Sequence, residues 1–360
     1  MGIIFPLGPY HPALAEPLAL RLRLRGEHIV GVDEPAAGAT GYRYRGVLEL
    51  IEGLPLDDAL VILERVCAHA GESYRLALCL AVEKIARPQL GRPTQLVRTL
   101  FAELERLHSV LWNLGEIARA VDQRRLWIAA LEERERLFEA AQAATGERVF
   151  WGVALPGGVR EGIILEPLRA FAGSANTLYE TWRAAAATNS PLRRVTDGLG
   201  RQEAEDALNC AAVYGSCLHD ARREAPYDAY RMMTLDWEPL EALDSTSMDT
   251  GAAVARLVAG LKLSVDIIVT CLEELDDEPN LQRATLKLTA GEGSAVAQTP
   301  HGSARVSVTL DGDGTVATLA LETSCANRIQ LIPRVLTNRA LGEAPALLAA
   351  LDLCPSCAEL

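Results

Sequence analysis

The amino-acid sequence predicts an α+β fold that is mainly α-helical, with a central bundle of long helices and small antiparallel β-sheets near the N-terminus and around residues 281–323. Two observations predict this architecture. Apolar residues recur at helical spacing through most of the chain from residue 56 to residue 275, whereas a short segment near each end alternates apolar and polar residues. A chain of 360 residues suits either one large domain or two intimately packed ones.

The N-terminal β-segment comes before the helices. Residues 17–32, PLALRLRLRGEHIVGV, alternate apolar and polar side chains around a central Gly-Glu pair, which predicts a β-hairpin. The helical stretches that follow are 56–86, 93–120, 123–145, 164–188, 200–220 and 250–275. The first two have a proline at their predicted start, where the first helical turn tolerates it.

The composition changes after residue 279. Residues 281–323 alternate with Thr, Val and Leu and contain DGDG at 311–314, which predicts a second hairpin or small sheet. A helix is predicted near 330–340, before an Ala- and Leu-rich segment that leads to DLCPSC.

The domain organisation follows from the absence of internal repeats and low-complexity linkers in the sequence. We expect one domain over residues 1–360. Its parts are an N-terminal β-containing segment (1–50), a helical bundle (51–278), and a β-hairpin region with the C-terminal cysteine segment (279–360).

Charge and hydropathy exclude several classes of protein. The net charge of −13 argues against nucleic-acid binding, which needs clustered Lys and Arg, and against a polybasic membrane anchor. There is no run of about 18 apolar residues that could span a bilayer. The N-terminus, MGIIFPLGPYHP, lacks the pattern of a signal peptide. A membrane connection would therefore come through partner subunits.

The best candidate site is the C-terminal CxxC motif formed by Cys354 and Cys357. Eight cysteines are too few for a disulfide scaffold in a chain of this length, so reduced thiols are expected. Two thiolates three residues apart can bind one soft or borderline metal ion. Two structural cysteines would fit the motif equally well. A remote third cysteine, Cys67 in the ERVC segment, favours the metal site.

Other residues have weaker signals. His69 could ligate a metal or carry protons, but a partly buried helical histidine is the more common case. Cys79 lies on an apolar helical stretch and is expected in the core, and Cys210 and Cys217 are expected to serve packing. The charged run from Glu103 to His108 is typical of a solvated, salt-bridged helix face. No phosphate-binding loop, dinucleotide fingerprint or nucleophile elbow occurs in the sequence.

The order of short motifs along the chain is more specific than any one of them. The motifs are GPYHPALAEP (8–17), GYRYRG (41–46), ERVC (64–67), ELERLHSVLWNLG (103–115), PGGVR (156–160), DARREAPYDAY (220–230), TPHG (299–302) and DLCPSC (352–357). Together they resemble the large subunit shared by nickel–iron hydrogenases and the 49-kDa subunit of respiratory complex I. The resemblance covers essentially the whole chain and is nearest to the energy-converting, membrane-bound (group 4) hydrogenase-related branch.

The resemblance implies a metal site with an incomplete ligand set. In the hydrogenases of this family two CxxC pairs hold nickel and iron. The C-terminal pair corresponds to Cys354 and Cys357, and the first cysteine of the N-terminal pair to Cys67. The fourth position is Ala70, so one bridging thiolate is absent. The arginine that overhangs the metals in the family corresponds to His301, which with Cys357 is the implied catalytic residue.

Further departures fall around the same site. The family's histidine after the first cysteine pair corresponds to Tyr74, its histidine in the second motif to Tyr44, and its acidic proton-relay residue to Leu48. The histidine and tyrosine that bind quinone in complex I correspond to Ala15 and Ala68. Neither hydrogen chemistry nor quinone chemistry therefore has its usual complement of residues.

The resemblance implies a large, catalytic-type subunit of a membrane-associated oxidoreductase complex that couples electron transfer to ion translocation. Nickel and iron, or a single metal, would occupy the incomplete site, and conventional hydrogenase activity is not expected. The implied partners are an iron–sulfur small subunit, other hydrophilic-arm subunits and antiporter-like membrane subunits that pump ions, with the chain peripheral on the cytoplasmic face. Two alternatives remain: a metal-free structural or coupling subunit, and a quinone-reducing module with an altered pocket.

Overall fold

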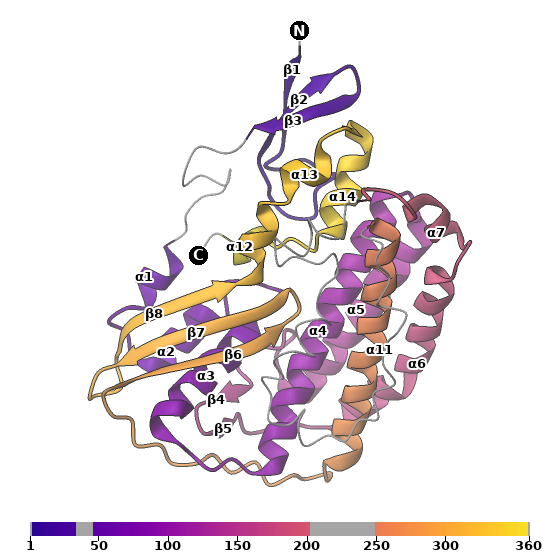
Figure 1. Ribbon diagram of the computed structural model, residues 1–360. Coiled ribbons are helices and arrows are strands. Elements are labelled where there is room, and N and C mark those ends of the chain that lie inside the picture. Colours follow the sequence, from indigo (N-terminus) through magenta and orange to yellow (C-terminus); the bar gives the residue numbers. More distant parts are fainter. Residues whose placement is uncertain (1, 34–45, 202–248, 359–360) are drawn as a thin grey trace.

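The computed structural model describes residues 2–33, 46–201 and 249–358 and has the predicted α+β architecture, about half helical with small antiparallel sheets. Figure 1 shows the long helices on one side, a three-stranded sheet beside them, and a second small sheet above both. The predicted helix 200–220 and the residues Tyr44, Cys210 and Cys217 lie outside the described residues. Within the described ranges, no helix has both the length and the apolar character of a membrane span.

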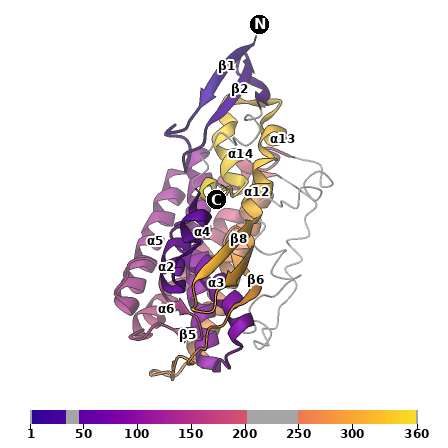
Figure 2. The same ribbon diagram turned by 90° about the vertical axis from the view of Figure 1, so that its left-hand side faces the viewer.

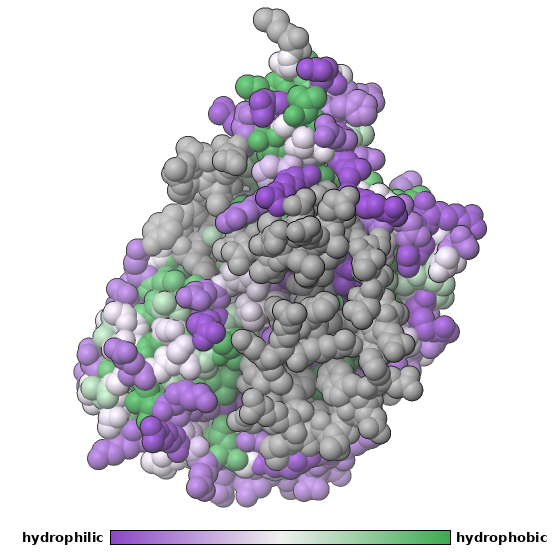
Figure 3. Space-filling model, in the orientation of Figure 1, coloured by the Kyte–Doolittle hydropathy of each residue, from purple (hydrophilic) through white to green (hydrophobic). Residues whose placement is uncertain are grey.

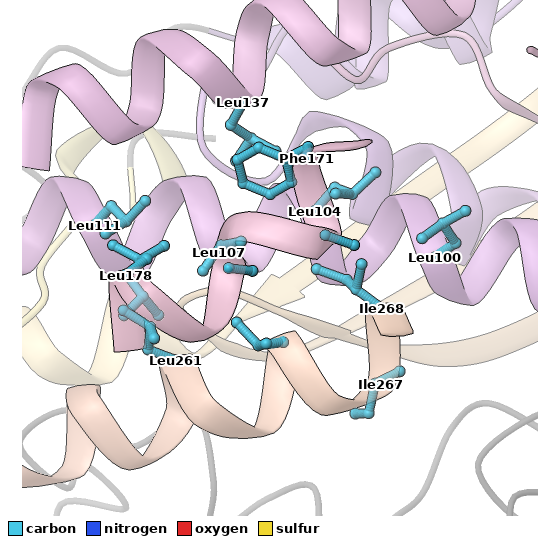
Figure 4. Packing of buried hydrophobic residues seen from close by; sticks show 14 of the residues in the cluster. Leu100, Leu104, Leu107, Leu111, Leu137, Phe171, Leu178, Leu261, Ile267 and Ile268 are labelled. Atoms are coloured by element: carbon cyan, nitrogen blue, oxygen red, sulfur yellow. The ribbon is translucent and has the colours of Figure 1, made fainter. Parts of the chain in front are cut away.

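The helical bundle is built around one central helix, α4. The bundle helices are α4 (Arg92–Ala120), α5 (Arg124–Thr145), α6 (Glu166–Ala186), α7 (Pro191–Thr196) and α11 (Thr250–Glu274). Helix α4 packs against both α5 and α11, so nearly all its side chains from Leu96 to Ala118 are buried. Figure 4 shows Leu104 and Leu107 of α4 meeting Phe171 of α6 and Ile268 of α11.

The charged run from Glu103 to His108 corrects an expectation, because it is buried and not a solvated face. Glu103, Glu105, Arg106 and His108 are each at most 3% exposed. The two carboxylate oxygens of Glu105 accept hydrogen bonds from the backbone N–H groups of Glu72 and Ser73, in the first turn of helix α3 (Gly71–Ala86). The charges therefore connect α4 to its neighbours, which a pattern within one helix does not reveal.

The second layer is a three-stranded antiparallel sheet with a helix on one face. The strands are β6 (Gly291–Thr299), β7 (Gly302–Leu310) and β8 (Val316–Thr323). The helix covering the sheet is α3 (Gly71–Ala86), which contacts β6 and β7 (Figures 1 and 2). The predicted β-region begins later than expected, since residues 281–289 have no regular structure.

The predicted helix 56–86 is interrupted around Cys67. It divides into α2 (Leu56–Leu63) and α3, preceded by the short α1 (Val47–Ile51), and Cys67 lies in the connection between α2 and α3. The buried Glu64 holds this connection, because its carboxylate accepts hydrogen bonds from Arg75 and from the backbone N–H of Gly152. Nearby, β4 (Ala154–Leu155) and β5 (Gly158–Val159) form a two-stranded ribbon.

The N-terminal sheet contains the predicted hairpin and two strands that were not predicted. The hairpin is β2 (Leu20–Arg25) and β3 (His28–Asp33), joined at Gly26, whose φ is 60°. Strand β1 (Ile3–Leu7) pairs with β2, and β9 (Arg339–Ala340) pairs with β3. The remaining elements are α12 (Ser324–Ile329), α13 (Ile332–Leu336), η2 (Leu341–Glu343), α14 (Ala344–Ala350) and η3 (Pro355–Cys357). The predicted helix near 330–340 is thus the shorter α13 followed by β9.

Candidate metal centre

Three segments that are distant in sequence bring the four predicted site residues together. Cys67 comes from the connection before α3, His301 from the turn between β6 and β7, and Cys354 and Cys357 from the segment around η3. One potential ligand atom from each of the four lies within 4.8 Å of every other, and all four residues are buried. The sulfur atoms of Cys67 and Cys354 are 3.5 Å apart. Whether these groups bind a metal stays a prediction.

Local backbone structure places each thiol. Pro355 opens the 3₁₀ turn η3, and the N–H of Cys357 donates to the carbonyl of Cys354, so that both thiols of the CxxC motif lie on one short turn. The N–H of His69 donates to the sulfur of Cys67 at 3.3 Å. The hydroxyl of Thr323 donates to the carbonyl of Cys357 and ties the turn to the end of β8.

His301 is held by a chain of charged groups. Its Nδ1 is 3.1 Å from Oδ1 of Asp352, and Oδ2 of Asp352 is 3.1 Å from Nη1 of Arg328. Burial acts to lower the pKa of His301, but the adjacent Asp352 carboxylate and the cysteine sulfurs raise that pKa well above its ordinary value. Burial acts to raise the pKa of Asp352, but His301 and Arg328 lower it. The contact with Asp352 orients the ring with Nε2 away from this carboxylate.

The groups around Cys67 change the pKa of its thiol. Hydrogen bonds from the Cys354 and Cys357 thiols, together with the charge on His301, hold the pKa of Cys67 well below its ordinary value. Nε2 of His301 is buried and has no partner of good hydrogen-bond geometry among the described residues, although the cysteine sulfurs lie beside it. Three thiols beside a buried imidazole nitrogen form a donor set that suits a thiophilic metal ion, to which the cysteines would bind as thiolates.

Glu16 is a site residue that the sequence analysis missed. The thiol of Cys354 donates to Oε2 of Glu16 at 3.6 Å, and Oε1 of Glu16 is 3.9 Å from Nε2 of His69. Burial, and then the charge of Cys67, raise the pKa of Glu16 to about 7. Its only sequence signal was membership of the GPYHPALAEP motif, which marked the family resemblance without assigning a role to this carboxyl group.

A small cavity joins Glu16 to His301. Its volume is about 60 Å³, and its lining includes Ala15, Glu16, His69, Trp112 and His301. A cavity of this size holds a few water-sized molecules, whereas sites for drug-sized ligands occupy several hundred Å³. The cavity therefore lies beside the thiol cluster, with the Glu16 carboxyl group and the His301 ring at its wall.

His69 and His108 form a buried stack behind this cavity. Their ring centroids are 4.9 Å apart with an interplanar angle of 7°. Burial lowers the pKa of His69 to about 4. The expectation of a helical His69 is wrong in its location, because the residue lies in the connection before α3, but it is correct that the side chain is buried.

A second missed residue is Cys325, at the start of α12. It is fully buried, and its thiol is hydrogen-bonded to that of Cys357. This hydrogen bond lowers the pKa of Cys325 to about 7, against the opposing effect of burial. No local pattern marks it, since it has no CxxC partner and lies in the TSCAN segment, where strand β8 runs directly into the short helix α12. The sequence analysis assigned it no role.

The other predicted positions fall around the site in different ways. Ala70 and Tyr74 are buried in the same apolar cluster as the three cysteines, and the Tyr74 hydroxyl is hydrogen-bonded to Cys357. Ala15 lines the cavity, whereas Ala68 is exposed. Leu48 is partly buried on α1, and Cys79 is in the core as expected.

Comparisons with known proteins agree with this architecture. The family model of the respiratory-chain NADH dehydrogenase 49 Kd subunit matches residues 124–290. The chain is 26% identical to the carbon monoxide-induced hydrogenase of Rhodospirillum rubrum, over 98% of each chain. It is 23% identical to an F(420)H(2) dehydrogenase subunit of Methanosarcina mazei, over 98% of this chain and 96% of that one. Its identity to an NADH-quinone oxidoreductase subunit of Xanthobacter autotrophicus is 31%, over 64% of this chain and 58% of that one.

The full-length relatives include proteins named as a hydrogenase and as dehydrogenase or oxidoreductase subunits, and the family model covers much of the helical bundle. The motif order, the α+β fold and these matches lead to the same assignment. They support the family that unites the 49-kDa subunit of complex I with the large subunit of nickel–iron hydrogenases.

Proposed function

We propose that this protein is the metal-containing large subunit of a membrane-associated, energy-converting oxidoreductase complex in which conventional hydrogen chemistry is modified or lost. The observation that carries the proposal is the buried cluster of Cys67, Cys354, Cys357 and His301, with ligand atoms within 4.8 Å of one another. Buried thiolates and an unsatisfied imidazole nitrogen are costly without a compensating ion.

The residues present fit a thiophilic metal. Cys67, Cys354 and Cys357 would hold it, as nickel with iron or as a single ion, and the metal would supply redox chemistry and Lewis acidity. His301 faces the thiols from the TPHG turn and is held by Asp352, where a neutral or charged imidazole would take part of the role of the family's arginine. Glu16 lines the cavity and contacts Cys354, so it is placed to take or give a proton beside the cluster.

The absent fourth thiolate at Ala70 supports a change of chemistry. A methyl group cannot bridge two metals, so the usual four-cysteine set cannot form from these two motifs. We expect little or no hydrogen uptake or evolution from the native complex. The cavity of about 60 Å³ favours a small substrate, and Ala15 in its wall offers no hydrogen bond to a quinone head group.

Partner subunits complete the proposal. The sequence has no four-cysteine motif for an iron–sulfur cluster of its own, so we propose a small subunit whose cluster faces Cys67 and residues 352–357. Other hydrophilic-arm subunits and ion-pumping membrane subunits would hold the chain at the cytoplasmic face. The exposed apolar side chains of Ile3, Ile4 and Tyr10 support a covered N-terminal region. In Figure 3, hydrophobic residues are visible at the N-terminal end of a mostly hydrophilic surface.

Metal analysis of the purified native complex tests the proposal. We expect a stoichiometric thiophilic metal that is lost when Cys67 or Cys354 is replaced by alanine. Cys79→Ala is the matched control, because Cys79 is equally buried on α3 but lies among Glu83, Arg98 and Arg75. A native complex without such a metal beyond the iron of its clusters would overturn the proposal and leave the metal-free coupling subunit as the function.

A further inference from the structure

Cys325 lies against the metal-site cysteines without belonging to either cysteine motif. It is fully buried in the apolar cluster that also contains Cys67, Ala70, Cys354 and Cys357. Its thiol is hydrogen-bonded to the thiol of Cys357. Cys67, His301, Cys354 and Cys357 form the group whose ligand atoms lie within 4.8 Å of one another, and Cys325 adjoins this group through Cys357.

The neighbours of Cys325 fix it in this position. Thr323, two residues earlier, donates to the Cys357 carbonyl at 2.7 Å, and Ser324 donates to the Ser303 carbonyl at 3.1 Å. Arg328, one helical turn later, donates to the backbone carbonyl and to the carboxylate of Asp352. The turn from β8 into α12 is thus attached to both the cysteine segment and the start of β7, with Cys325 between the attachments.

The two cysteine motifs together supply three thiols, one fewer than the four of the family's metal site. Ala70 contributes only a methyl group, so the connection before α3 supplies one thiol, and the C-terminal turn supplies two. Nε2 of His301, on a residue 6% exposed, has no partner of good geometry among the described residues and faces the sulfur atoms. This unsatisfied nitrogen is an observation independent of Cys325 that indicates an ion at this point.

We propose that Cys325 is a fourth sulfur ligand of the metal centre, bound on the Cys357 side and substituting for the thiolate that Ala70 cannot provide. The inference rests on the proposed metal-containing function and adds a ligand from a different element, α12, to the three expected ones. Four thiolates form a soft donor set that selects ions such as zinc, copper(I) or iron over hard cations. The site would thereby keep a four-sulfur composition with a changed geometry.

X-ray absorption spectroscopy of the native complex, at the edge of each metal found outside the clusters, counts the sulfur ligands directly. We expect four sulfur atoms at roughly 2.3 Å in the parent protein and three in Cys325→Ala and Cys325→Ser. Metal loss to a competing chelator should be at least about tenfold faster in both variants, as for other changes that weaken metal ligation. Cys79→Ala, a buried cysteine in the same apolar cluster, should retain four sulfurs and the parent rate.

The outcomes separate this inference from the function on which it rests. A parent complex with metal bound by three sulfurs, or a Cys325→Ala variant with an unchanged sulfur count, overturns the Cys325 assignment and leaves the three-cysteine site intact. A parent complex with no such metal overturns both. Because the parent alone decides between three and four sulfurs, the test does not depend on whether the variants fold.

Discussion

The stacked imidazoles of His69 and His108, behind the candidate metal site, show how a single residue can make the stability of the fold sensitive to pH. His108 is 3% exposed, and its Nδ1 accepts a hydrogen bond from Nε of Arg134 at 3.1 Å. Its other nitrogen is hydrogen-bonded to the backbone of Ala68. Burial, the neighbouring His69 and the Arg134 cation all lower the pKa of His108 well below its ordinary value. The ring is therefore neutral, with its proton on Nε2.

We predict that acid weakens the protein through His108. Below a pH of about 6.5 the unfolded chain binds a proton at this residue and the folded protein does not. The free energy of unfolding therefore decreases as the pH is lowered, by up to about 1.4 kcal/mol per pH unit. We measure the free energy of unfolding by urea titration between about pH 6.5 and 5. In His108→Gln its dependence on pH should be weaker than in the parent, by up to about 1.4 kcal/mol per pH unit. Phe138→Leu, which removes a ring packed 4.8 Å from His108 without removing a titrating group, should lower stability equally at every pH. An unchanged slope in His108→Gln would contradict the lowered pKa of His108 in the folded protein.

At the scale of the elements, the close packing of α3 on the three-stranded sheet positions the site. Helix α3 begins at Gly71, directly after the connection that carries Cys67, and strand β6 leads directly into the turn with His301. Gly293 on β6 allows this approach, since a Cβ there would overlap the carbonyl oxygen of Ala81 on α3. Any displacement of α3 from β6 would separate Cys67 from His301.

We predict that Gly293→Ala destabilises the protein by about 1–3 kcal/mol, the usual cost of overpacking, and reduces metal retention. The free energy of unfolding and the metal content should fall together, because one contact governs both. Gly312→Ala is the matched control, as a Cβ at this turn glycine meets nothing within 4 Å. Full metal occupancy in a clearly destabilised Gly293→Ala protein would show that the site does not depend on this packing.

At the scale of the whole molecule, the chain has the features of one component in a larger assembly. It is similar over nearly its full length to proteins named as a hydrogenase and as subunits of a dehydrogenase and an oxidoreductase. Its candidate redox site is a buried thiol cluster, and electron transfer to such a site needs a nearby carrier that the sequence itself lacks.

We predict that the tagged chain, isolated gently from its host, co-purifies with a smaller protein that contains iron and acid-labile sulfide. The pair should be found in the membrane fraction and leave it only when the membrane is disrupted or partner contacts are broken. Quantitative mass spectrometry and iron and sulfide assays on the purified complex measure this. A stable monomer in cell extracts, free of clusters and of membrane partners, would contradict the predicted assembly.

The sequence predicted most of the regular structure, because helix and strand periodicities are local. The bundle helices 93–120, 123–145, 164–188 and 250–275 were predicted to within a few residues, as was the hairpin at 17–32. Local periodicity failed where tertiary contacts decide the backbone. The break between α2 and α3 depends on Glu64 bonding to Arg75 and to residue 152, far along the chain. The charged face of α4 is buried because several other elements surround it.

The candidate site divides in the same way between sequence and structure. The spacing of Cys354 and Cys357 is a property of one turn, so the sequence by itself determined that these two thiols can act together. Cys67 was a remote candidate from the sequence, but its ligand position, and His301 altogether, came only from the order of the family motifs. Only the tertiary structure brought Glu16 and Cys325 to the cluster, because their positions depend on how the N-terminal segment and α12 pack around it. No short-range pattern encodes that packing, and contacts between residues 338 positions apart, as between Glu16 and Cys354, are decided by the fold as a whole.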